Sequence, residues 1–378
     1  MIAKHRLDST VTPGINGAVA MGDAPGATAA PDPAQIPAEV RVAVTADLRT
    51  AVPRTMKAIA QDRYGAPEVL KLVEIDTPTV GDDDVLVRVR AASVHIGDWH
   101  VMTGLPYVLR VLGFGFRAPK ARVRGLDLGG TVEAVGKNVT RFQAGDDVFG
   151  TGDGSFAEYA RAREDSLMAK PAGLTFEQAA TVPTSACSAL KALRNEGEIQ
   201  SGQKVLIVGA SGGVGMFAVQ IAKSFGAEVT GVCSTAKADL VRSLGADHVI
   251  DYTREDFARG KQRYDLIVDL GGSRPLSALR RALKPTGTLV LAGGEGGGSL
   301  LGGIGNWLKA LVLTPFVSQR LRPLTSKDKH DDLVVVKELI DAGKLTPRID
   351  RTYPLSEVAE AFRYLKSGRA QGKIVIAG

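Results

Sequence analysis

The 378-residue sequence has only two cysteines, Cys187 and Cys233, and no apolar secretory segment near its start. Two cysteines cannot build a disulfide framework or a four-cysteine zinc lobe, so a reducing, cytoplasmic location is expected. Lys and Arg outnumber Asp and Glu only by 47 to 41, and no basic run alternates with aromatic residues. This composition argues against nucleic acid as a partner and suits a small anionic ligand.

Aromatic residues are absent from the first 55 residues, which are rich in Gly, Ala and Pro and show no apolar period. Such a segment cannot bury enough surface to offset the cost of ordering it, so residues 1–55 are predicted to form a disordered extension. A transit peptide is the alternative, and Asp8, Asp23, Asp32 and Glu39 argue against it.

No apolar run is long enough to span a bilayer, which excludes an integral membrane protein. The most apolar stretch, around 302–318, is predicted to be a buried helix at a domain or subunit interface; a pocket lid or a peripheral membrane contact are the alternatives. Residues 56–180 contain short Val- and Ile-rich runs separated by turn residues, which indicates a β domain. Residues 181–318 alternate apolar runs with helical segments, as parallel sheets do.

The stretch VLIVGASGGVG, which begins at Val205, is a buried strand followed by a glycine-rich turn and a helix. Gly209, Gly212 and Gly215 fall on that turn, where a backbone can approach a pyrophosphate closely and a helix N-terminus can face it. A plain turn packed on the next strand is the alternative. The expected cofactor-binding turn also includes Ser211, Gly213 and Val214.

The next apolar run ends in CSTAK and carries no acidic residue at the position that holds the ribose of NAD. Ser234, Thr235 and Lys237 stand there instead, and hydroxyls and a cation favour a 2′-phosphate. The pattern therefore predicts NADPH, although an exposed helix start with a solvated Lys237 remains open.

Together GASGGVG, CSTAK, GADHVIDYT, YDLIVDLGG and QGKIVIAG resemble the zinc-free quinone oxidoreductase branch of the medium-chain dehydrogenase/reductase superfamily, from about Met56 to Gly378. The resemblance implies an α/β fold: a GroES-like β domain (56–180 and 319–378) interrupted by a Rossmann domain (181–318) with a doubly wound parallel sheet. It also implies NADPH between the domains, a 2′-phosphate held by Lys237 and Tyr252, and a homodimer.

The resemblance also shows what is missing. Zinc alcohol dehydrogenases of this superfamily carry a Gly-His-Glu segment, and here RGLDLGG has Leu126 and Asp127 at the His and Glu positions. His95, His100 and Cys187 are not spaced as a tetrahedral site requires. No metal is therefore expected.

Pocket residues are expected in SVHIGDWHVMTGLPY, which contains His95, Asp98, Trp99 and Tyr107. The family usually has Asn where His95 stands, so His95 is either a structural histidine or a donor to a substrate oxygen. Trp99 and Tyr107 either line the pocket or pack ordinarily; enoyl-thioester reductases place a catalytic tyrosine in a similar stretch.

Three further residues resemble family positions near the nicotinamide half of the cofactor, with plain turns or a solvated lysine as the alternatives: Gly271, Gly293 and Lys373. A quinone or α,β-unsaturated carbonyl carries its own electron sink and needs little acid-base help from the protein. The expected function is an NADPH-dependent, zinc-independent reductase of such small hydrophobic substrates. An enoyl-thioester reductase, a zinc-independent alcohol dehydrogenase and a non-catalytic NADPH-binding regulatory protein are the alternatives.

Overall fold

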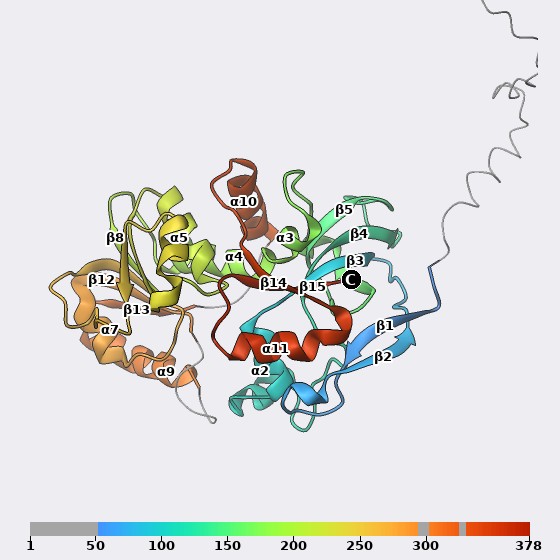
Figure 1. Cartoon of the computed structure of the whole chain (residues 1–378), viewed down its shortest axis with the longest axis horizontal. Helices are drawn as coiled ribbons and strands as arrows, with labels where there is room; N and C mark the ends of the chain where they lie inside the picture. Colours follow the sequence, from blue (N-terminus) through green and yellow to red (C-terminus); the bar gives the residue numbers. More distant parts are fainter. Residues whose placement is uncertain (1–51, 294–301, 325–329) are drawn as a thin grey trace, which may run out of the picture. The chain divides into compact units, whose positions relative to one another are not determined.

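The computed structural model describes residues 52–293, 302–324 and 330–378 (Figure 1). The predicted extension therefore lies outside the described residues except for its last four. Thr55 already belongs to strand β1 (Thr55–Ala60), and the N–H of Thr77 donates to the carbonyl of Arg54 at 2.9 Å. Regular structure thus begins one residue before the predicted start at Met56.

The first sheet has seven strands and combines residues from both sides of the parallel-sheet domain. The last strand of the chain, β15, pairs antiparallel with β3, and Ile374 lies opposite Val94. This pairing makes one β domain of two distant chain segments, as predicted. The strand order is β14 (Ile349–Pro354), β15 (Lys373–Ala377), β3 (Asp84–Val94), β4 (Asp127–Val135), β5 (Asp147–Thr151) and β7 (Leu167–Ala169), with β6 (Tyr159–Arg163) on β3; separately, β1 pairs with β2 (Lys71–Asp76).

The second sheet is wholly parallel and has six strands, because its apolar runs are joined by crossover segments. The chain winds outward from β8 in one direction and then returns to place β11 on its other side, and ligands bind in such sheets where this reversal occurs. The strand order is β10 (His248–Asp251), β9 (Glu228–Cys233), β8 (Lys204–Val208), β11 (Tyr264–Asp269), β12 (Leu283–Leu291) and β13 (Arg320–Pro323).

The helices pack on the sheets through apolar faces; in α5, for example, Phe217 and Ile221 are fully buried. The helices are α2 (Ile96–Thr103), α3 (Phe176–Ala180), α4 (Pro183–Leu190), α5 (Gly215–Ser224), α6 (Ala238–Ser243), α7 (Leu276–Ala282), α9 (Ile304–Leu313), α10 (His330–Asp341) and α11 (Val358–Lys366). Short helical turns are η2 (Pro67–Val69), η3 (Arg110–Phe114), η4 (Glu164–Ser166), η5 (Lys191–Glu196), η6 (Thr235–Lys237), η7 (Thr314–Phe316) and η8 (Leu355–Glu357).

The structure corrects the later domain boundary, which was predicted at residue 319. Strand β13 pairs parallel with β12, so the parallel sheet continues to Pro323. Helix α10 then buries Leu333 and Val336 in the same core as α4 and α5. The chain returns to the β domain only at β14 (Figure 1). A four-residue strand such as RLRP is too short to reveal from its sequence which sheet it joins.

The apolar stretch around 302–318 forms α9 and η7. Leu311, Val312 and Phe316 are largely exposed, Phe316 at 81%, so the segment is not buried within the chain itself, and its burial at a subunit interface stays a prediction. Among the helices described, none combines the length and the apolar character needed to cross a bilayer.

Candidate active site

The glycine-rich turn between β8 and α5 brings backbone atoms together as the sequence predicts. Gly209 has φ +85°, and a Cβ on Gly215 would lie 2.1 Å from the carbonyl oxygen of Gly209. The N-cap position of α5, Val214, provides no side-chain cap. The N–H of Met216 already donates to the carbonyl of Gly212 at 2.9 Å. The N–H groups just before it, at the junction of the turn and α5, are the ones placed to face a pyrophosphate.

Two more loops close around this turn at the ends of β11 and β12. A Cβ on Gly209 would lie 3.4 Å from the nitrogen of Gly271, and a Cβ on Gly293 would lie 2.4 Å from that of Gly272. Beneath them, the carboxylate of Asp269 accepts the N–H of Gly272 at 3.1 Å, and burial raises the pKa of Asp269 to about 6. The predicted glycines thus form one backbone-lined edge with the glycine-rich turn.

The predicted ribose residues lie at the ends of β9 and β10. Ser234 and Thr235 begin the turn η6 directly after β9. The amine of Lys237 donates to the carbonyl of Gly368 at 2.7 Å, and burial lowers the pKa of Lys237. Tyr252 follows β10; its ring is half exposed, and its N–H donates to the carbonyl of Cys233 at 3.0 Å.

Asp251, in the same edge, was missed in the sequence. It ends β10 opposite Cys233 of β9. The hydroxyl of Thr235 donates to it, and Thr253 donates to it at 2.7 Å. The hydrogen bond from Thr235 holds the pKa of Asp251 below its usual range. The position of Asp251 at the end of an apolar run, directly before the predicted cofactor residue Tyr252, is the signal that could have indicated it.

A second group of side chains gathers at one edge of the antiparallel sheet. Asp127 pairs with Ser93 across β3 and β4, and Lys373 comes directly before the pair Ile374 and Val94. Side chains opposite each other across two strands share a face of the sheet, and so do residues two apart in a strand. Ser93, His95, Asp127 and Lys373 are therefore on one face.

The first turn of α4 covers that face. The N–H of Thr184 donates to Oδ1 of Asp127 at 3.2 Å, and the Thr184 hydroxyl donates to the same atom. The amine of Lys373 donates to Oγ of Ser185 at 2.9 Å. Burial raises the pKa of Asp127 and lowers that of Lys373, and the charge of each opposes the shift of the other.

This strand-end cluster, defined as Ser93, Asp127, Thr184, Ser185 and Lys373, adjoins the glycine-rich turn. A Cβ on Gly213 would lie 3.0 Å from Cδ of Lys373 and 3.7 Å from Oγ of Ser185. Lys373, predicted as a cofactor residue, is therefore beside the turn that was predicted with it. In the sequence, Asp127 was recognised only as the residue at a missing metal position.

His95 is the N-cap of α2, as its structural alternative required. Its Nδ1 accepts the N–H of Asp98 at 3.3 Å, and the carboxylate of Asp98 accepts the N–H of His95 at 3.1 Å. Nε2 of His95 lies 3.4 Å from Asp98 without forming a hydrogen bond, and it is buried without any other partner. One ring nitrogen is thus structural, and the other makes no hydrogen bond with any residue that the structure describes.

Trp99 and Tyr107 are not part of this cluster. The ring of Trp99 packs on Phe362 of α11 with centroids 6.4 Å apart, which is the ordinary packing left open by the sequence. Tyr107 is 47% exposed, and the guanidinium of Arg110 lies 4.8 Å from its ring centroid.

The residues do not fit a zinc ion. Leu126 offers no donor atom, and the oxygens of the buried Asp127 accept hydrogen bonds from Ser93 and Thr184. Within the described ranges, no three His, Cys, Asp or Glu side chains are grouped so that they could hold a metal.

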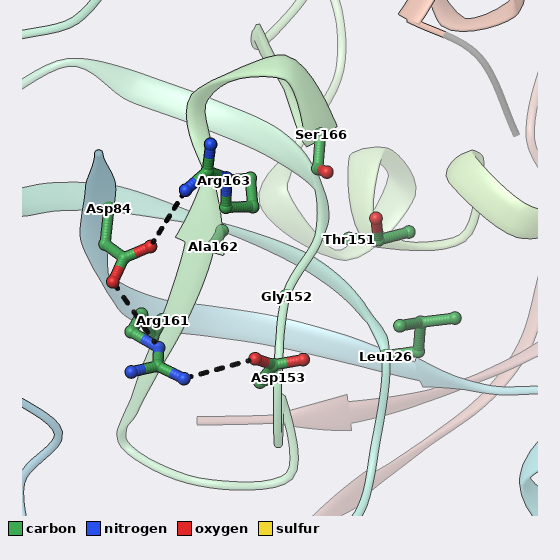
Figure 2. A pocket seen from close by; sticks show the side chains of 9 residues that line it. All are labelled: Asp84, Leu126, Thr151, Gly152, Asp153, Arg161, Ala162, Arg163 and Ser166. Atoms are coloured by element: carbon green, nitrogen blue, oxygen red, sulfur yellow. Dashed lines mark ion pairs between the residues drawn. The ribbon is translucent and has the colours of Figure 1, made fainter. Parts of the chain in front are cut away.

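A cavity of about 240 Å³ lies within the antiparallel domain (Figure 2). Arg161 spans it between Asp84 and Asp153, at 3.7 Å from each. The arginine and aspartate charges that line the cavity are thus paired with each other. Every lining residue comes from residues 84–166. The cavity does not include the glycine-rich turn, so it is not the dinucleotide site.

A glycine-rich turn that leads into a helix at the reversal of a parallel sheet is typical of a dinucleotide-binding protein. Two family models match the chain: the alcohol dehydrogenase GroES-like domain over residues 81–172 and the zinc-binding dehydrogenase over 244–376. The mouse mitochondrial NAD(P)H oxidoreductase RTN4IP1 is 35% identical over 357 residues, which cover 85% of this chain and 89% of that protein.

The chloroplastic NADPH-dependent alkenal/one oxidoreductase of Arabidopsis thaliana is 32% identical, over 90% of this chain and 83% of that protein. The structure of the quinone oxidoreductase from Coxiella burnetii matches with a TM-score of 0.74 and 30% identity, over 86% of this chain and 99% of that one. The chain belongs to the quinone oxidoreductase-like medium-chain dehydrogenases/reductases, and it is an oxidoreductase.

Proposed function

We propose that this chain is an NADPH-dependent, zinc-independent reductase of quinones or α,β-unsaturated carbonyls. The observation that carries the proposal is the composition of the ribose end. Strand β9 ends without an acid, and Lys237 closes the turn η6 that follows it, with its amine on a neutral carbonyl. A phosphate is a stronger acceptor for that amine than a carbonyl is. The relatives named for NADPH, alkenals and quinones support the same reading.

The residues fit a dinucleotide, because the glycines let the backbone of the turn pack tightly and keep side chains off its edge, as at Gly215, where a Cβ would lie 2.1 Å from the carbonyl oxygen of Gly209. The uncapped start of α5 would hold the pyrophosphate, and Lys237 with Tyr252 the 2′-phosphate. The backbone at Gly271 and Gly293 would line the nicotinamide half. NADPH, when bound there, supplies the hydride.

His95 supplies the hydrogen bond to the substrate oxygen in this proposal. Its Nδ1 accepts a backbone N–H, so the proton of the neutral ring is on Nε2. Among the described residues Nε2 makes no hydrogen bond, and the carboxylate of Asp98 lies 3.4 Å from it. A quinone or enone oxygen that gains charge during reduction is a suitable acceptor for that Nε2–H.

Zinc independence is supported by the donor set. Leu126 and the fully engaged Asp127 leave no metal site where zinc alcohol dehydrogenases have one. A substrate that spreads the incoming charge over its own conjugated system does not require a Lewis acid. Simple alcohols and ketones are therefore expected to be poor substrates.

The test is NADPH and NADH oxidation by the purified full chain with ortho- and para-quinones, alkenals, enones, enoyl thioesters and simple ketones, together with metal analysis. We expect turnover of quinones or enals with NADPH and no stoichiometric zinc. Selective reduction of enoyl thioesters would favour the enoyl-thioester alternative. NADPH binding without turnover of any acceptor would favour a regulatory protein, and stoichiometric zinc would contradict metal independence.

We also propose a homodimer formed at the edge of the parallel sheet, and a cytoplasmic location. β13 ends the described sheet on one side, and the segment before it exposes Leu311, Val312 and Phe316. An open strand edge next to apolar side chains is suited to pairing with a second copy. Phe316→Asp should shift the sedimentation of the chain from dimer to monomer; an unchanged dimer would place the interface elsewhere. Fractionation of cells tests the location.

A further inference from the structure

Two charged side chains, Asp127 and Lys373, are buried on the same face of the antiparallel sheet. Asp127 is fully buried and Lys373 is 2% exposed. Both lie on the face of the antiparallel sheet that the first turn of α4 covers, and both bond to that turn, through Thr184 and Ser185. Burying an unpaired charge is costly, so two such groups are expected to stabilise each other.

We propose that Asp127 is a positioning residue: its buried carboxylate holds the first turn of α4, where Ser185 accepts the amine of Lys373, so that the cofactor meets a fixed positive charge beside the glycine-rich turn. The inference rests on the proposed role of Lys373 in cofactor binding. It assigns a charge-setting role to the residue that stands where zinc relatives have glutamate.

The geometry gives Asp127 two contacts of different kinds. Through Oδ1 it accepts the N–H and the hydroxyl of Thr184, which compensates for the absence of any side-chain cap from the N-cap residue of α4, Val182. Through Oδ2 it accepts the hydroxyl of Ser93 on β3 at 3.4 Å. Lys373 lies on the same face, on the strand at the other side of β3, and its stem packs over Gly213. A displacement of Asp127 would therefore be felt at the glycine-rich turn.

The charged groups around Lys373 act in opposite directions. Burial lowers the pKa of Lys373, whereas Asp127 from β4 and Asp98 from α2 raise it. Around Asp127, burial raises the pKa, and His95 and Lys373 lower it. Ser185 of α4 contributes a neutral acceptor. Asp127 is the larger of the two carboxylate influences on Lys373, so its removal should let the lysine lose its proton at lower pH.

The experiment is titration of the full chain with NADPH, followed by nucleotide fluorescence, between about pH 6 and pH 10. Asp127→Asn keeps an acceptor for Thr184 but deletes the charge. We expect the pH at which NADPH affinity is half lost to fall by about one unit, with roughly 10-fold weaker binding near pH 8. Thr184→Val is the matched control: it removes one contact with Asp127 but no charge, and it should leave that pH unchanged.

The variant Lys373→Met distinguishes the proposed cofactor role of Lys373 from the positioning role of Asp127. Unchanged NADPH affinity in Lys373→Met would contradict the proposed cofactor role of Lys373. Weakened affinity in Lys373→Met together with an unshifted pH curve in Asp127→Asn would overturn only the inference. If Asp127→Asn alone does not fold, the double variant Asp127→Asn/Lys373→Met decides, because it leaves no unpaired buried cation. Restored folding supports the pair, and continued failure to fold contradicts it.

Discussion

The edge of the parallel sheet and the facing edge of the antiparallel sheet present different chemistry at the candidate active site. At the ends of β8, β11 and β12 the surface is backbone: Gly209 has φ +85°, and a Cβ on Gly293 would lie 2.4 Å from the nitrogen of Gly272. At the ends of β3, β4 and β15 it consists of side chains, among them Asp127 and Lys373. In the proposed function, the first edge would take a dinucleotide pyrophosphate through its backbone, whereas the second edge and Lys237 would add charge and specificity.

The two buried carboxylates show the same contrast. Asp269 accepts a backbone N–H from Gly272, and the nearest cation that influences it, Arg274, is its smallest influence. Asp127 accepts hydroxyls and faces Lys373 and His95. A buried carboxylate supported only by backbone is favoured in its neutral form, whereas one beside buried cations can act on their charge.

Gly215→Val is expected to have the largest effect, because it tests whether the parallel-sheet edge works through backbone alone. The new Cβ would lie 2.1 Å from a carbonyl oxygen, so the turn must open. We expect roughly 1,000-fold weaker NADPH binding or loss of folding, as measured by fluorescence titration and thermal melting. Gly305→Ala in α9 is the control, since nothing lies within 4 Å of its added Cβ. Ordinary NADPH affinity in Gly215→Val would disprove the cradle.

Asp269→Asn sharpens the comparison of the two carboxylates. The folded pKa of Asp269 is about 6, above its ordinary 3.8, so ionisation is resisted in the folded state. Below pH 3.8 both states are protonated; from there to about pH 6 the unfolded state loses its proton first and stability falls. The free energy of unfolding of Asp269→Asn should therefore gain up to about 3 kcal/mol on the parent chain between acid and neutral pH.

Asp265→Asn, on the same strand, is the control of opposite sign. Burial would raise the pKa of Asp265, but the hydrogen bond from Lys284 and its other partners hold it below the usual value. Its loss should therefore destabilise the protein at neutral pH. Denaturant unfolding at several pH values distinguishes the two variants, and a pH-independent difference for Asp269→Asn would refute a neutral Asp269.

Lys237→Ala tests whether a side chain of the parallel-sheet domain, the amine of Lys237, distinguishes NADPH from NADH. We expect about 10-fold weaker binding of NADPH and unchanged binding of NADH, because only NADPH offers a 2′-phosphate to the amine. Competition titration with the two cofactors measures the ratio. Equal losses for both cofactors would mean that Lys237 serves the fold, through its bond to Gly368, rather than the phosphate.

Removal of residues 1–51 should have the smallest effect, below about 0.5 kcal/mol in unfolding free energy, with NADPH affinity unchanged. It retains Pro53 and Arg54, whose carbonyls accept the hydroxyl and the N–H of Thr77 at 2.7 and 2.9 Å. Removal of residues 1–60 is the contrasting variant, because it deletes β1 and the buried Ile59. A large loss of stability in the shorter deletion would show that the extension is structural.

The predictions from sequence succeeded where the chemistry is local. Residues 209–215 connect β8 to α5 within a few residues, so the sequence alone predicts the strand, the turn and the helix in their order along the chain. The second sheet and the interrupted β domain followed from apolar periodicity and the resemblance. The placement of β13 failed because a short strand carries no record of its partner.

The sequence by itself determined the cradle, the two-domain order and the absence of an acid after β9, because each depends on neighbours in the chain. Only the tertiary structure decided that Asp127 meets Thr184 and that Lys373 meets Ser185, since these residues come from three segments that are distant in sequence. It also divided His95 between a structural Nδ1 and an unpartnered Nε2. Strand register and helix docking set these contacts, and both are products of packing the whole chain.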